Sequence, residues 1–292
     1  MKLTNKYNLP QPVVTALTRS EYSRGDSNRS ITQLIDSPRV RILRKEHDDE
    51  ISEDVSDKLW AVLGNGVHKM FENSADENHA TEERLFIDVE GWTISGAIDL
   101  QQTDGDGVIV KDYKTTSIWS VIYGKVEWEY QLNCYAALVR RAKGVKVNGL
   151  RVIAIMRDWK ANDAATKPDY PVSPIMEIEI PMWSEAEQDS YILKRVQLHQ
   201  QAEFERLTGS ELPDCTDEER WAKDPTWAVI KKGNKRATKV FDKPDEAHAF
   251  ATEQGSAFEV VFRKGESVRC AANWCRVNEW CSQYKKSVES SE

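Results

Sequence analysis

The sequence has no apolar run that approaches the ~20 residues of a membrane-spanning helix. Its first residues also lack the apolar core of a signal peptide. These absences predict a cytoplasmic protein with no segment in a membrane. An excess of positive charge is missing as well, because the 292 residues carry a formal net charge of −8. A protein that coats nucleic acid would be basic overall, so that class is excluded, whereas a local basic cleft is not.

Cysteine is scarce, with five residues in the whole chain. So few cysteines without a secretion signal do not predict a disulfide framework. Cys134 lies in an apolar helical segment and is expected in the core. Three others cluster in one short segment as Cys270, Cys275 and Cys281. Cys215 would complete a set of four thiolates that suits Zn²⁺ or a [4Fe–4S] cluster, and buried structural cysteines are the alternative.

The composition that is present, 40% hydrophobic and 30% charged residues, is that of a globular protein. The length of 292 residues predicts one large domain or one domain with an appendage. Strand patterns and helical patterns alternate along its first two thirds. This order predicts an α/β core in which helices flank a mixed central sheet. After Gly209 a hairpin, a short helix and a further strand predict a small ββαβ module. We therefore expect three parts: a flexible N-terminal arm (1–29), the core (30–208) and a C-terminal ββαβ module with the cysteine cluster (209–292).

The stretch from Gly96 to Lys114 predicts two strands joined by a polar turn at residues 101–107. Such a hairpin brings Asp99 and Asp112 to one point, with Lys114 beside them. Two carboxylates form a hard oxygen site that suits Mg²⁺ or Mn²⁺. An ammonium group there can orient a water or neutralise phosphate charge. The alternative is that both aspartates only cap the ends of strands.

A second acid-x-Lys triplet, Asp158-Trp159-Lys160, also follows a predicted strand. No hairpin strand with an acidic residue precedes it in the same way. We therefore interpret it as a solvated strand end and assign the chemistry to Asp112 and Lys114.

Two further segments carry polar groups on predicted helices. His68 follows Gly64 and Gly66, and these glycines weaken the helix but let a ligand or a backbone approach closely. Gln131 and Tyr135 are four residues apart and share a helix face, which suits contact with a phosphate or a base. A surface histidine and a helix face packed on the sheet are the alternatives.

Four motifs stand in this order: Gly64–His68, Gly96–Asp99, Asp112–Lys114 and Gln131–Tyr135. The set resembles the RecB-like exonuclease branch of the PD-(D/E)XK nuclease superfamily, which includes CRISPR-associated RecB-type and phage recombination exonucleases. The resemblance covers residues 30–205 and implies a restriction-endonuclease-like nuclease core.

The resemblance also implies roles for individual residues. His68, Asp99, Asp112 and the carbonyl of Tyr113 would hold Mg²⁺ or Mn²⁺, and Lys114 would assist the attacking water. Gln131 and Tyr135 would position DNA. Thr115 and Thr116 directly follow Lys114 and offer hydroxyl groups to phosphate.

The implied function is a metal-dependent DNA exonuclease, rather than an endonuclease, that hydrolyses phosphodiester bonds by a metal-activated water. It would serve DNA recombination, repair or processing in a phage or a prokaryote, in the bacterial host cytoplasm if phage-encoded, with recombination or replication proteins as partners. One alternative is a catalytically silent DNA-end-binding or scaffold protein with the same fold. Another is a cysteine-metal interaction module whose α/β part is only structural. The intact Asp99, Asp112 and Lys114 favour the enzyme.

Several RecB-like nucleases carry a [4Fe–4S] cluster on three C-terminal cysteines, the last two separated by five residues as in this chain. Here four residues, not two, separate Cys270 from Cys275, and Ser37-Pro38 stands where those relatives have their fourth cysteine. With Cys215 as the fourth ligand we favour the cluster and leave Zn²⁺ open.

The predicted C-terminal hairpin is rich in basic residues, namely Lys231, Lys232, Lys235, Arg236 and Lys239. In an acidic protein such a group suits a surface that tracks the phosphates of DNA. A solvated hairpin tip is an equally good interpretation.

Overall fold

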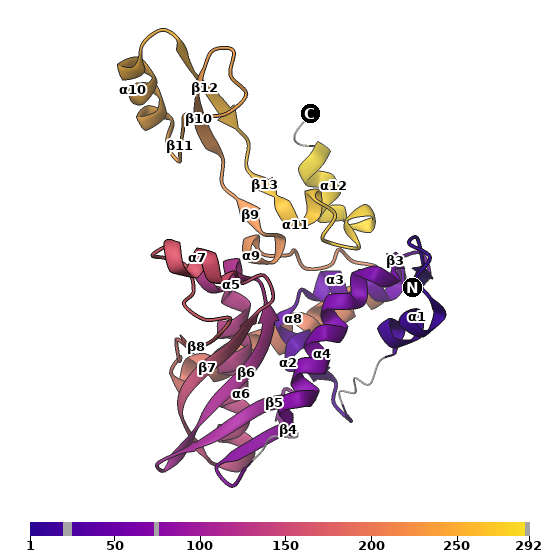
Figure 1. Cartoon of the computed structure of the whole chain (residues 1–292). Coiled ribbons are helices and arrows are strands. Elements are labelled where there is room, and N and C mark those ends of the chain that lie inside the picture. Colours follow the sequence, from indigo (N-terminus) through magenta and orange to yellow (C-terminus); the bar gives the residue numbers. More distant parts are fainter. Residues whose placement is uncertain (20–24, 73–75, 290–292) are drawn as a thin grey trace. The chain divides into compact units, whose positions relative to one another are not determined.

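The computed structural model describes residues 1–19, 25–72 and 76–289 of the chain (Figure 1). They form two compact units. The first comprises Met1–Pro38 and Asp48–Glu211, and the second comprises Arg39–His47 and Leu212–Glu292. Residues 39–47, which the sequence analysis places in the core, therefore group with the C-terminal part. Among the described residues no helix is long and apolar enough to cross a membrane.

A six-stranded mixed sheet forms the centre of the first unit (Figure 1). Its order is β2-β5-β6-β7-β8, and β4 pairs with β5. The pairs β2·β5 and β6·β7 are parallel, whereas β4·β5, β5·β6 and β7·β8 are antiparallel. The strands are β2 (Arg29–Ser30), β4 (His79–Val89), β5 (Trp92–Asp104), β6 (Gly107–Thr116), β7 (Lys146–Met156) and β8 (Ile175–Ile180). The expected mixed sheet is confirmed.

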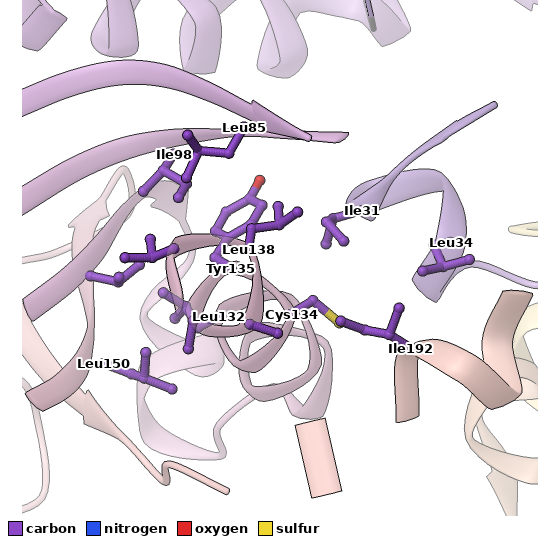
Figure 2. Packing of buried hydrophobic residues seen from close by; sticks show 14 of the residues in the cluster. Ile31, Leu34, Leu85, Ile98, Leu132, Cys134, Tyr135, Leu138, Leu150 and Ile192 are labelled. Atoms are coloured by element: carbon purple, nitrogen blue, oxygen red, sulfur yellow. The ribbon is translucent and has the colours of Figure 1, made fainter. Parts of the chain in front are cut away.

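Helix α6 (Val126–Lys143) crosses from β6 to β7 and is the centre of the core. Ten of its residues are buried, from Trp128 to Val139. Figure 2 shows Leu132, Cys134 and Leu138 of this helix among side chains of the sheet and of neighbouring helices. Cys134 is 1% exposed, as expected for a core cysteine.

Three further helices complete the core and the site: α2 (Ile31–Ile35), α4 (Leu59–Glu72) and α8 (Glu185–Thr208). Ser184 and Glu187 form a capping box at the start of α8. Ser30 and Gln33 form another at the start of α2. These caps satisfy backbone donors that would otherwise be left unpaired at the helix ends.

The N-terminal stretch, expected as a flexible arm, contains two elements. Strand β1 (Lys2–Thr4) pairs in parallel with β3 (Ser52–Asp54), and α1 spans Gln11–Thr18. The Asp54 carboxylate accepts hydrogen bonds from the Thr4 hydroxyl and the Lys6 N–H at 2.9 and 2.8 Å, which fixes this end of the chain. Residues 20–24 of the expected arm lie outside the described residues.

The hairpin between β5 and β6 has a shorter turn than the sequence predicts. Strand β5 continues to Asp104, and only Gly105 and Asp106 form the turn. The ladder stops at the pair Leu100–Lys111, so the strands part where Asp99 and Asp112 follow. This parting leaves space for a site between two paired strands.

The second unit contains the expected ββαβ module: β10 (Thr226–Lys231), β11 (Lys239–Phe241), α10 (Pro244–Gln254) and β12 (Phe258–Arg263). Its sheet is antiparallel with the order β11-β10-β12. Strand β11 has only three residues, because residues 232–238 form the loop of the hairpin. The remaining elements are α3 (Pro38–Glu46), α9 (Asp217–Arg220), β9 (Ala222–Lys223), β13 (Glu266–Ser267), α11 (Val268–Ala271) and α12 (Ser282–Glu289).

Gly96 is the point where β5 meets α6 most closely. A Cβ atom at Gly96 would lie 2.7 Å from both the Tyr135 ring and the Leu138 side chain. We therefore predict that Gly96→Ala lowers the free energy of unfolding of the first unit by about 1–3 kcal/mol, the usual cost of overpacking a core. Urea denaturation followed by circular dichroism measures this change.

Gly64→Ala is the matched control, since a Cβ atom there meets nothing within 4 Å. Alanine favours a helix over glycine by about 1 kcal/mol, so this variant should be as stable as the parent or more stable. Equal losses for the two variants would contradict the packing role of Gly96.

Candidate active site

Asp99 and Asp112 lie side by side where β5 and β6 part. Both are buried, at 6% and 1% exposure. The Asp99 Oδ2 atom accepts the backbone N–H of Tyr113 at 2.8 Å, which ties the two strands together beyond the last ladder pair. The predicted approach of the two aspartates is thus present in the structure.

Asp112 is held in a ring of three side chains. Gln131 Nε2 donates to Asp112 Oδ1 at 3.0 Å, and Lys114 Nζ donates to Gln131 Oε1 at 3.0 Å. The ring closes with an ion pair of 2.5 Å between Lys114 Nζ and Asp112 Oδ2. Gln131 also donates to the Tyr135 hydroxyl at 2.9 Å. Gln131 therefore fixes the carboxylate and the ammonium at once, and its contact with DNA stays a prediction.

Burial raises the pKa of Asp112 to about 7, because desolvation of the carboxylate outweighs its attraction to the Lys114 ammonium. The nearby Asp99 carboxylate raises it further. A carboxyl group in this state gains from any additional positive charge brought to the site. The chemistry of the site therefore favours a bound cation.

His68 lies on α4 and points into the same site. Its Nε2 atom is 3.0 Å from the Tyr113 carbonyl oxygen. Its Nδ1 atom is 3.4 Å from Asp99 Oδ2 and 3.7 Å from Glu82 Oε1. The bonds to Asp99 and then Glu82 raise the pKa of His68 to about 10. Three oxygen atoms thus surround one ring, and two of them, from Asp99 and the Tyr113 carbonyl, are oxygens expected around a metal.

The sequence analysis missed Glu82. One ligand atom each of His68, Glu82 and Asp99 lies within 4.8 Å of the others, a grouping able to hold a metal ion. Asp112 does not belong to this closest group and lies next to it, within electrostatic reach of Asp99 and His68. Glu82 has a φ of +50°, a strained conformation inside a strand.

A signal for Glu82 was available in the sequence. The hairpin β4–β5 turns at Glu90-Gly91 and pairs Val89 with Trp92. Counting back along both strands places Glu82 opposite Asp99. The observed ladder pairs Thr81 with Leu100 and Glu83 with Ile98, and leaves out these two acids.

These residues line a cavity of about 820 Å³ in the first unit. Asn65 and Gly66 of α4 form part of its wall. Apart from its chain neighbours and the backbone of α4 itself, no atom of the described residues lies within 4 Å of a Cβ built at Gly66. The glycine thus does not serve packing inside the protein, which agrees with the expected approach of a ligand.

Thr115 and Thr116 lie on opposite faces of β6, because side chains alternate along a strand. Thr116 shares the face of Asp112 and Lys114, whereas Thr115 does not. The Thr115 Oγ1 atom is buried and has no hydrogen-bond partner among the described residues. Contact of either hydroxyl with phosphate stays a prediction.

The second triplet has a structural role. Asp158 Oδ1 accepts the backbone N–H of Ile118 at 2.8 Å, and Trp159 Nε1 donates to the Pro171 carbonyl at 2.7 Å. Neither residue belongs to the cavity of Asp99 and Asp112. The choice of Asp112 and Lys114 over this triplet agrees with these contacts.

The second unit holds the four cysteines Cys215, Cys270, Cys275 and Cys281 around one small enclosed cavity. All four are 5–8% exposed. Burial raises the pKa of Cys270 to about 11, and the nearby Cys275 and Cys281 thiols contribute to this rise to a smaller extent. Arg39 lies against this group, with Nη1 3.9 Å from Cys281 Sγ and 2.9 Å from Ser282 Oγ.

Four cysteine thiolates can hold either Zn²⁺ or an iron–sulfur cluster. Tetrahedral Zn²⁺ with bonds of about 2.3 Å would require sulfurs about 3.8 Å apart. The choice between a single zinc ion and a cluster therefore stays a prediction.

The basic side chains of the predicted hairpin are all exposed: Lys231, Lys232, Lys235, Arg236 and Lys239. Lys239 Nζ lies 4.8 Å from the centre of the Phe241 ring and 5.3 Å from that of Phe250. The other four have no ion pair within the described part of the second unit. This arrangement is available to an anionic ligand.

The fold and the site define a class of protein: an α/β protein whose mixed sheet parts to present buried carboxylates, a lysine and a histidine, the donor set of a metal-dependent hydrolase. The family model of the PD-(D/E)XK nuclease superfamily matches residues 28–282. The chain belongs to this superfamily. The family points to phosphodiester hydrolysis in a nucleic acid with the help of a divalent metal.

No curated protein matches the chain. Among solved structures, the crystal structure of SSO0001 is 20% identical, covers 64% of this chain and 82% of its own, and gives a TM-score of 0.41. A likeness at this level carries no argument about function.

We predict that Glu82→Gln weakens Mn²⁺ binding by about 10- to 100-fold, the range found for groups that surround a metal. The amide keeps the shape of the side chain but removes its charge from the group with His68 and Asp99. Calorimetric titration of the protein with MnCl₂ measures the affinity.

Glu83→Gln is the matched control. Glu83 points away from the site. Its Oε2 atom accepts hydrogen bonds from Gln101 Nε2 at 2.7 Å and from Lys143 Nζ at 2.6 Å. It should bind Mn²⁺ as the parent does. If both variants lost affinity equally, Glu82 would contribute only to the general negative charge of the strand.

Proposed function

We propose that the chain is a Mg²⁺- or Mn²⁺-dependent DNA exonuclease of the RecB-like type. The observation that carries this proposal is the ring of Asp112, Gln131 and Lys114 next to His68 and Asp99. The order of these residues along the chain is that of RecB-like exonucleases, which supports the branch and the exonuclease mode. A role in DNA recombination, repair or processing in a phage or a prokaryote follows from the same resemblance.

The donor set fits a hard divalent cation. Asp99, Asp112, His68 and the Tyr113 carbonyl would hold it, and Glu82 would join them. When bound, the metal would neutralise phosphate charge and make a water more acidic. Lys114 is held by Asp112 and Gln131, so its ammonium group keeps one position at which it can hold the attacking water. Gln131 in turn is held by Tyr135.

A catalytically silent DNA-end-binding protein is the rival proposal. Such a protein would gain nothing from crowding the buried Asp99 and Asp112, since taking like charges out of water is costly. Natural sequences keep such arrangements at functional sites. The enzyme therefore accounts for the site better than the scaffold.

We predict that the parent protein releases nucleotides from end-labelled linear DNA in the presence of Mg²⁺ or Mn²⁺ and leaves closed circular DNA intact. Asp112→Asn should lower this rate by roughly 10²-fold or more, as expected when a charge that stabilises the transition state is removed. Its folded state should persist, because the change removes a buried charge. Lys114→Ala should act in the same way.

Lys160→Ala is the control for Lys114→Ala, because it alters the other triplet. It should cleave DNA at close to the parental rate. Equal damage from the two lysine variants would show that the wrong triplet was assigned, and cleavage of circular DNA would contradict the exonuclease mode.

We further propose that the basic hairpin of the second unit binds DNA phosphates. Replacing Lys231, Lys232 and Lys235 together by alanine should weaken DNA binding. The slope of log affinity against log salt concentration should become shallower by about 0.9 for each phosphate that is no longer neutralised, because fewer counterions are released. Lys285→Ala, an exposed position on α12, serves as the control. An unchanged slope in the triple variant would show that the hairpin is a solvated tip that does not contact DNA phosphates.

The four cysteines of the second unit are proposed as ligands of a [4Fe–4S] cluster, with Zn²⁺ as the alternative. The five residues between Cys275 and Cys281, as in RecB-like nucleases with a cluster, favour the cluster. The Arg39 guanidinium beside Cys281 would offset the negative charge of four thiolates. In this chain Cys215 takes the place of a ligand that relatives supply near Ser37.

Changing Cys275 or Cys281 to serine should release the bound metal and destabilise the second unit, since thiolate ligation contributes roughly 10 kcal/mol or more in zinc-finger peptides. Absorption spectra and metal analysis after anaerobic purification identify the group: a brown protein indicates the cluster, and a colourless protein with stoichiometric zinc indicates Zn²⁺. A metal-free protein of full stability would show that the four cysteines are buried structural residues and not ligands.

A further inference from the structure

Two aromatic side chains lie exposed directly after the strand that carries Asp112 and Lys114. Helix α5 (Ile118–Ile122) begins two residues beyond the end of β6, and Figure 1 shows it at the end of that strand. Trp119 on this helix is 56% exposed, and Tyr123 at its C-terminus is 79% exposed. Their rings are stacked, with centroids 5.9 Å apart and an angle of 11° between planes.

Burial does not explain these two rings. The inner face of α5 is already filled by Ile118, which is 6% exposed and packs with Met156 and Tyr170. Val121 and Ile122 pack partly buried against the same cluster. The helix therefore has its apolar anchor without Trp119 or Tyr123. Two large rings left in water on a helix of five residues indicate a surface that binds a ligand.

The backbone that carries the two rings is held by three hydrogen bonds. The Ile118 N–H donates to Asp158 Oδ1 at 2.8 Å, and the Trp119 N–H donates to Ser117 Oγ at 3.2 Å. The Tyr123 N–H donates to the Trp119 carbonyl at 3.0 Å. A surface fixed in this way loses little entropy when a ligand binds.

Position along the chain identifies the ligand. Trp119 follows Lys114 by five residues, so its Cα lies within about 17 Å of that of Lys114. A phosphodiester strand bound at the site extends on both sides of the bond that is cut. At about 3.4 Å per stacked nucleotide, roughly five nucleotides of a strand that runs toward α5 would span this distance.

We propose that Trp119 and Tyr123 form a stacking platform for unpaired bases of the strand being cut, so that single-stranded DNA or an overhang is the preferred substrate. This inference rests on the proposed nuclease function and adds its substrate class. Aromatic side chains stack on bases of any sequence, and only unpaired bases expose a face to them. A protein partner fits less well, because two rings offer about 300–500 Å² against the ~800 Å² per partner of a standard interface.

Binding is measured in the full chain carrying Asp112→Asn, so that DNA is not cut, by fluorescence anisotropy with a labelled single-stranded oligonucleotide and a blunt duplex of the same sequence. Trp119→Ala and Tyr123→Ala should each lower the affinity for the single strand by about tenfold. The affinity for the duplex should not change. The salt dependence should keep its slope, because the same number of phosphates is neutralised.

Three controls separate stacking from general damage. Trp119→Phe and Tyr123→Phe keep a flat ring and should restore most of the affinity. Phe204→Ala removes a ring that is 67% exposed on α8 and should leave single-strand binding unchanged. Equal loss on single strand and duplex, or failure of the phenylalanine variants to restore binding, would overturn the platform.

The outcomes also separate this inference from the nuclease itself. If the chain with native Asp112 cleaves DNA and the double alanine variant keeps the same preference for single strands, the platform is wrong and the nuclease stands. If the chain with native Asp112 does not cleave but the alanine variants lose single-strand affinity, the platform stands and the nuclease is wrong. Unchanged single-strand affinity would overturn the platform and leave the rings to a protein partner.

Discussion

The crowding of Asp99 and Asp112 in a buried place is the constraint on which the rest of the first unit depends. Two carboxylates taken out of water repel each other and lose hydration, so cations and donors must surround them. The protein provides Lys114, His68 and the amide of Gln131, together with the Tyr113 N–H. With Glu82 in the same group, the carboxylates still outnumber the basic side chains, which favours a divalent cation.

The contact between β5 and α6 positions the groups that surround the two aspartates. Gly96 lets the Tyr135 ring approach the strand, and Tyr135 then holds Gln131 against Asp112 and Lys114. A larger residue at Gly96 would move the helix and, through it, the ammonium group. The strained backbone of Glu82 belongs to the same arrangement, because the ladder leaves out Glu82 and Asp99 while their carboxylates group with His68. The geometry of the site therefore depends directly on the packing of the core.

Much of this arrangement could be predicted from the sequence. The alternation of apolar residues and the turn residues indicate β5 and β6, and the hairpin then requires Asp99 and Asp112 to meet. The position of His68 beside them depends on how α4 packs on the sheet, which local pattern does not encode, so it came from the resemblance. Glu82 was within reach of a register count but was overlooked, because the first half of β4 does not alternate clearly. The grouping of residues 39–47 with the cysteines, and the short β11, depend on tertiary contacts that no local pattern shows.

The most direct test of the account is an anomalous difference map from crystals of the protein grown with Mn²⁺. We expect one strong peak at the parting of β5 and β6, within bonding distance of His68, Asp99, Asp112 and the Tyr113 carbonyl. Glu82 should be at or next to the ion. A peak elsewhere in the first unit, or none there in a crystal that takes up Mn²⁺ at other sites, would contradict the claim that the buried carboxylates exist to bind a metal.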